Sequence, residues 1–123
     1  MNESHGAFRA LYTDPETASV GLLLEQARER GIDAEELTKD LASTAKGEAA
    51  EAEGHVTLVV DRGAGTLAGA FLAGPSVSEA IHEAVLAVKL QTPLAVLADT
   101  IHAFPTVARV MGLLFVEAVT APR

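Results

Sequence analysis

Two apolar segments in the middle of the chain have the alternation expected of paired β-strands. Residues 55–60 and 66–73 are rich in strand-forming side chains, and residues 61–65 between them contain two glycines that can adopt positive φ. The pattern predicts a β-hairpin with one buried face. We expect that face to be formed by Val56, Leu58, Val60, Leu67, Phe71 and Ala73.

The residues that follow change to helical periodicity. Ser76 and Glu79 have the spacing of a capping box, which predicts a helix from there to about residue 91. Leu86 and Leu90 add apolar side chains opposite the main stripe, so this helix requires two neighbours. The main stripe consists of Val77, Ile81, Ala84, Val85 and Val88.

Two further helices are predicted towards the end of the chain. Thr92 as N-cap and Pro93 at the first helical position predict a short helix to about residue 98. Thr106 caps a last helix over residues 107–119, which is apolar on nearly every side. Because a small domain cannot easily bury such a helix alone, we predict an oligomer.

The first half of the chain gives weaker signals. Residues 8–12 are a candidate strand, followed by turn-forming residues at 13–15. Residues 22–30 are helix formers, and Gly31 is placed for a left-handed C-terminal cap. These features predict a strand, a turn and a two-turn helix.

Two segments before the hairpin are harder to assign. For residues 32–41 propensity favours a helix, whereas the position after a helix stop favours a returning strand, which we prefer. Residues 43–54 are rich in Ala and Glu and poor in large apolar groups. We interpret them as a solvated connector or a frayed turn.

Size and composition limit the class of protein. A chain of 123 residues and 12.8 kDa, 49% of it hydrophobic, fits one domain over residues 1–123 with its own core. No apolar run exceeds the seven residues 110–116, so a membrane-spanning helix is excluded, and a secretory signal is not expected. We expect a cytoplasmic protein. The absence of cysteine excludes disulfides, thiol nucleophiles and thiolate metal sites within this chain.

The charge distribution bears on partners. A net charge of −8, with only nine scattered Lys and Arg residues, argues against nucleic acid. Residues 1–54 carry twelve acidic and five basic residues, whereas residues 55–123 carry five and four. The nearly neutral second half is therefore expected to form the core and any contact surface.

Two motifs suggest chemistry but have simpler interpretations. The glycines from Gly63 to Gly69 resemble a dinucleotide-binding string, yet a strand is predicted after them where that motif needs a helix. His82 with Glu83, and Asp99 with His102, are possible metal ligands, but no third cluster completes a site. We interpret them as surface or interface residues and predict no metal site. No catalytic constellation is visible.

The order of the segments resembles a known family. FRALYTDPETASVGL, DRGAGTLAGAFLAGP, SEAIHEAVLAVKL and LADTIHAFPT are similar to the C-terminal dimerisation domain of the flavin-dependent pyridine nucleotide-disulfide oxidoreductases. That family includes dihydrolipoamide dehydrogenase, mercuric reductase and glutathione reductase, and the similarity covers about residues 8–119. It implies an α+β fold, an antiparallel sheet with helices packed on it, and a homodimer.

The same resemblance implies where chemistry would occur in a complete enzyme. Disulfide reductases of the family place a His before the Pro-Thr and a Glu three residues after the Thr. The His is a catalytic base paired with the Glu carboxylate, and together they serve the redox cysteines and flavin of the partner subunit. Here these positions are Phe104 and Arg109, which can neither accept a proton nor orient an imidazolium. The backbone at Phe104 and Pro105 would approach the partner subunit's flavin.

The resemblance leaves three hypotheses. The first is the homodimerisation domain of a flavoenzyme that moves hydride from NAD(P)H through FAD, but not as a disulfide reductase through this site. FAD and NAD(P)H would be held by domains outside this chain, which alone is expected to be inactive and to bind neither. The second is a free-standing homodimer or a docking module for a flavoenzyme. The third is a small-ligand binder that uses Arg109 and His102.

Overall fold

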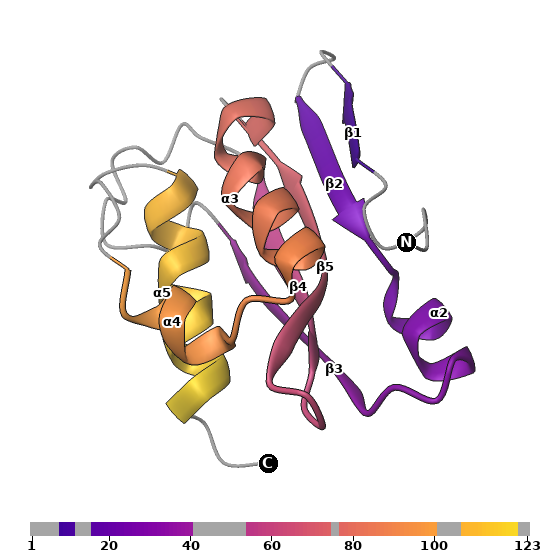
Figure 1. Cartoon of the computed structure of the whole chain (residues 1–123). Helices are drawn as coiled ribbons and strands as arrows, with labels where there is room; N and C mark the ends of the chain where they lie inside the picture. The colour runs from indigo at the N-terminus through magenta and orange to yellow at the C-terminus, as the bar shows by residue number, and fades with distance from the viewer. Residues whose placement is uncertain (1–7, 12–15, 41–53, 75–76, 101–106, 121–123) are drawn as a thin grey trace.

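A five-stranded antiparallel sheet, in the order β1-β2-β5-β4-β3, is packed with helices on one face (Figure 1). This is the α+β fold expected from the sequence. The structure, a computed structural model, describes residues 8–11, 16–40, 54–74, 77–100 and 107–120. Its elements are β1 (Phe8–Leu11), β2 (Thr17–Gly21), α2 (Leu24–Glu29), β3 (Ala34–Asp40), β4 (His55–Asp61), β5 (Thr66–Ala73), α3 (Val77–Leu90), α4 (Leu94–Ala98) and α5 (Val107–Thr120).

The central hairpin and two further strands confirm predictions. β4 pairs with β5 through a turn in which Gly65 has a φ of 71°. β1 and β3 lie within the segments 8–12 and 32–41 that the sequence assigns to strands. The dinucleotide-like glycine string thus belongs to a hairpin, because Thr66 begins β5 rather than a helix.

Strand β2 was not predicted. It pairs with β1 on one side and with β5 on the other, and its buried residues Ala18 and Val20 alternate with half-buried ones. The period of two is therefore present, but a single Ala and a single Val carry it. So short and weakly apolar an alternation does not distinguish a strand from a loop.

A β-bulge in β5 changes which residues of the hairpin are buried. Val59 pairs with Gly69, whereas the next residue, Val60, pairs with Leu67, so Ala68 is an extra residue in β5. Every position after the bulge is shifted to the opposite face. The hairpin residues in the main core are Val56, Leu58, Val60, Leu67, Ala70 and Leu72.

The bulge corrects two of our assignments. Phe71 and Ala73 were expected to face the main core, and both expectations were wrong. Phe71 packs instead against a second, smaller cluster on the other face of the sheet, beside α2.

Gly31 has a φ of 80° after α2, which confirms its predicted role as a left-handed cap.

The three helices predicted in the second half are confirmed, with one correction at a helix start. Thr92 is not the N-cap of α4, because Pro93 occupies that position with an extended backbone and pairs with Thr66. The N–H of Leu94 donates to the carbonyl of Gly65 over 2.8 Å. The start of α4 is thus fixed by the hairpin turn rather than by a threonine side chain.

The N-terminus of α3 is bound by a residue distant in sequence. One carboxylate oxygen of Glu16 accepts hydrogen bonds from the backbone N–H and the hydroxyl of Ser78, at 3.1 and 2.9 Å. The carbonyl of Glu16 also accepts the N–H of Gly74 at 2.8 Å. Glu16 therefore connects the start of β2 to the start of α3.

Several predictions concern residues outside the described ones. These are the turn at residues 13–15, nearly all of the connector at residues 43–54, and the capping residues Ser76 and Thr106. Within the described part of the chain, no helix has the length and apolarity needed to cross a bilayer.

Candidate dimer interface

Large apolar side chains are exposed on helices α3, α4 and α5, which share one core with the same face of the sheet (Figure 1). Their exposed fractions range from 38% at Leu113 to 64% at Leu90. Several exposed large apolar side chains on helices that pack together are typical of protein interaction sites. We call this set the outer helix face: Leu86, Leu90, Val96, Leu113, Val116 and Val119.

Helix α5 supplies half of the outer helix face because only part of its apolar surface can reach the sheet. Its buried residues are Val110, Met111, Leu114, Phe115 and Ala118. Leu113, Val116 and Val119 follow at intervals of three residues, which places them along one side of the helix. A helix that is apolar nearly all round thus buries one side and leaves another in solvent.

Helix α3 has the same division. Ile81, Ala84 and Val88 are buried against the sheet, whereas Leu86 and Leu90, four residues apart, are more than half exposed. The sequence predicted that this helix needs a neighbour on each side. In the described part of one chain, the neighbour of Leu86 and Leu90 is missing.

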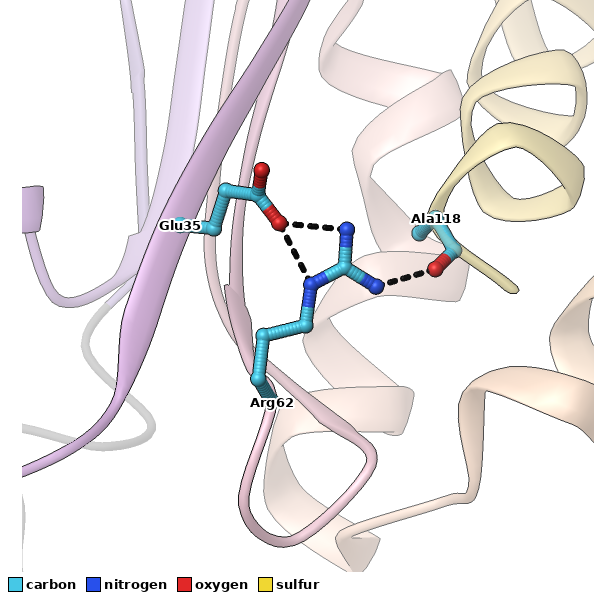
Figure 2. Close-up of polar contacts among 3 residues, drawn as sticks. All are labelled: Glu35, Arg62 and Ala118. Atoms are coloured by element: carbon cyan, nitrogen blue, oxygen red, sulfur yellow. Dashed lines mark hydrogen bonds and ion pairs between the residues drawn. The ribbon is translucent and has the colours of Figure 1, made fainter. Parts of the chain in front are cut away.

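Polar contacts fix the C-terminal end of α5 to the sheet (Figure 2). Arg62, which follows β4, directs Nε and Nη2 to Oε1 of Glu35 on β3, and Nη1 donates to the carbonyl of Ala118. Lys39 and Glu117 form a second, more exposed ion pair at 3.5 Å. No sequence motif indicates that residues 35, 62 and 118 meet, so our sequence analysis missed this cluster.

The residues singled out by the family resemblance are only partly visible. Phe104, Pro105 and His102 lie outside the described residues. Arg109 belongs to the first turn of α5, but its side chain is also outside them. Their roles therefore remain predictions.

The possible metal ligands that the structure describes are not gathered into a site. His82 is exposed on α3, and Asp99 is exposed at the C-terminal cap of α4. Among the described His, Asp and Glu side chains, no group of three is arranged to hold a metal ion. What the described residues do present is the exposed apolar outer helix face.

Comparison with known families gives a match over most of the chain. Residues 7–114 match the model of the pyridine nucleotide-disulphide oxidoreductase dimerisation domain. The dihydrolipoyl dehydrogenase of Geobacillus stearothermophilus is 35% identical over 101 residues, 81% of this chain and 22% of that relative. That of Chlamydia muridarum is 32% identical over 113 residues, 91% of this chain and 24% of that relative. The chain thus spans about a quarter of these relatives or less.

Solved structures show the same fold. LpdA from Mycobacterium tuberculosis superimposes with a TM-score of 0.83 at 22% identity, over 93% of this chain and 25% of that one. The HOCl-induced flavoprotein disulfide reductase RclA from Escherichia coli superimposes with a TM-score of 0.81 at 24% identity, over 89% of this chain and 26% of that one.

Proposed function

Because the chain belongs to the pyridine nucleotide-disulphide oxidoreductase dimerisation-domain family, we propose that it pairs with a second copy of itself in a flavin-dependent NAD(P)H oxidoreductase. The observation that carries the homodimer is the outer helix face. Six large apolar side chains on three packed helices are exposed in one described chain. A second copy that covers them would remove this surface from water.

We assign FAD and NAD(P)H to other domains of a complete enzyme rather than to this chain. The relatives it matches are about four times longer, which leaves room for such domains. The chain's own dinucleotide-like glycines form a hairpin turn followed by a strand, so no helix N-terminus faces a pyrophosphate there. FAD, when bound by the complete enzyme, would supply the hydride chemistry.

The proposed enzyme does not use this domain as the base in disulfide reduction. By the family pattern, a proton-accepting His would stand at Phe104 and a carboxylate at Arg109. A phenyl ring has no lone pair for a proton, and a guanidinium repels an imidazolium. The backbone of Phe104 and Pro105 would still be the part of this chain nearest to the partner subunit's flavin.

Glutamate substitutions test the homodimer. Val116→Glu puts a charge on the outer helix face, where burial without a partner costs several kcal/mol. We expect the dimer dissociation constant, measured by sedimentation equilibrium, to rise by about a hundredfold or more. The matched control is Leu23→Glu, because Leu23 is 52% exposed but lies between β2 and α2. A Val116→Glu protein that dimerises as strongly as the Leu23→Glu protein would contradict the proposal.

A further inference from the structure

We propose that Arg62 is a positioning residue for the dimer interface, which it holds in shape without touching the partner. It fixes the C-terminal end of α5 against the sheet, and so fixes the α5 part of the outer helix face. This inference rests on the proposed homodimer. It adds a residue outside the interface on which the affinity of the dimer depends.

The burial of Arg62 is the first observation. Only 10% of its side chain is exposed, whereas arginines are rarely so buried unless their charge is paired. Its backbone is held as well, since its N–H donates to the carbonyl of Asp33 over 2.8 Å. The guanidinium therefore projects from a fixed point between the sheet and α5.

The contacts of the guanidinium are the second observation (Figure 2). On one side it pairs with the carboxylate of Glu35, which belongs to edge strand β3. On the other side Nη1 donates to the carbonyl of Ala118 in the last turn of α5. The last four carbonyls of a helix lack partners within it, and a cation is favourable at that end of the helix dipole. One side chain thus joins β3, the hairpin turn and α5.

The position of Ala118 relates this contact to the interface. Val119 of the outer helix face is the next residue, and Val116 lies two residues earlier. The side chain of Ala118 itself is buried, so the end of α5 is held by packing on one side and by Arg62 at the carbonyl. The Lys39–Glu117 pair, 31% and 45% exposed, contributes less because solvent screens it.

The planar shape of the guanidinium makes arginine hard to replace here. Its donors diverge in a fixed plane, so it can bind a carboxylate and a carbonyl at the same time. A lysine carries the same charge but concentrates its donors on one nitrogen. We therefore expect Arg62→Lys to hold the end of α5 in part, and Arg62→Met not to hold it.

The test compares dimer affinity with fold stability in the 123-residue chain. Sedimentation equilibrium gives the dimer dissociation constant, and urea unfolding gives the stability of each variant. For Arg62→Met we expect the dissociation constant to rise about tenfold, because the end of α5, loosened in the free chain, would have to be ordered when the dimer forms. Arg62→Lys should give a smaller rise. In Arg62→Met, the rate of amide hydrogen exchange should increase more in the last turn of α5 than in the rest of the helix.

A matched control separates positioning from general destabilisation. Leu22→Val weakens the second core cluster beside α2, which contains no residue of α5. It should lower stability while leaving the dissociation constant within about threefold of the parent chain. Equal weakening by Arg62→Met and Leu22→Val, or no weakening by Arg62→Met, overturns the role of Arg62 and leaves the homodimer intact. A parent chain that is monomeric at every concentration overturns the homodimer itself, whatever Arg62→Met does.

Discussion

Gly69 lies where strand β5 comes closest to the chain leaving β2. A Cβ atom added at Gly69 would overlap the carbonyl oxygen of Leu22, and one added at Gly21 would overlap that of Ala68. The N–H of Leu22 donates to the same Ala68 carbonyl over 3.0 Å, so the backbones cannot move apart without losing this bond. Close approach, rather than phosphate binding, explains the third glycine of the dinucleotide-like string.

This contact predicts a large effect of a single methyl group. Gly69→Ala should lower the free energy of unfolding by about 3 kcal/mol, the upper end of ordinary overpacking costs, because the three atoms nearest to the added methyl group all belong to the backbone. Gly63→Ala is the control. Its added Cβ would meet only a side-chain oxygen of Asp61 at 3.4 Å, so we expect a change within about 0.5 kcal/mol. Urea unfolding that shows equal losses for both variants would contradict this account.

Residue roles were predictable from sequence only where they depend on near neighbours. Gly31 follows a run of helix formers, and its positive φ was predicted on that basis. The bulge at Ala68 and the contact between Arg62 and Ala118 depend on residues that meet only in the folded chain. A local pattern therefore placed Phe71 on the wrong face and gave no role to Arg62.

At the scale of elements, the start of helix α3 depends on Glu16, which precedes strand β2. The first N–H groups of a helix have no partner within it, and Glu16 accepts one of them from Ser78, with the serine hydroxyl in addition. A carboxylate at this end is also favourable for the helix dipole. The chain just before β2 and the start of α3 thus stabilise each other across the sheet.

We expect Glu16→Ala to lower the free energy of unfolding by about 1 kcal/mol, the usual effect of losing a helix cap. Glu16→Gln keeps a carbonyl oxygen that can accept from Ser78, so its loss should be smaller. Thermal unfolding followed by circular dichroism can rank the two variants and the parent chain. An unchanged Glu16→Ala protein would show that water replaces the carboxylate at no cost.

The longest elements were the easiest to predict, although the four-residue β1 and the five-residue α4 were predicted as well. Strands β4 and β5 and helices α3 and α5 each have seven or more residues, most of them apolar. Strand β2 has five residues, two of them apolar, and it forms because β1 and β5 pair with it on either side. Its position between two partner strands is a property of the sheet and not of its own pattern.

For the whole molecule, the central question is what covers the outer helix face. The sequence predicted an oligomer because α5 is too apolar for a small domain, and the structure shows where the excess lies. On α3 the sequence already placed Leu86 and Leu90 opposite the main stripe. For α4 and α5 it could not be predicted which side stays exposed, because that depends on how the helices pack together. The chain belongs to a family of dimerisation domains, which is consistent with self-association through this face.

The proposed enzyme predicts a specific response to thiol reagents. An antibody to this domain should isolate from the source cells a flavin-containing species of roughly 50 kDa per chain, the size of a few ordinary domains. Its oxidation of NAD(P)H should continue after alkylation by N-ethylmaleimide. Phe104 and Arg109 replace the His base and Glu carboxylate of disulfide reductases, so the reaction is not expected to pass through thiols. Loss of turnover on alkylation would contradict this. A native species of 12.8 kDa would instead support a free-standing docking module.

The mass of the unmodified chain in solution tests the homodimer without any substitution. Sedimentation equilibrium over a wide range of concentrations should give a reversible transition from 12.8 kDa to twice that value and no larger species. We expect growth to stop at the dimer, because two copies that bind through the same face leave that face unavailable to a third copy. A mass of 12.8 kDa at every concentration, or continuous growth beyond the dimer, would contradict the assignment of the outer helix face as the surface of a homodimer.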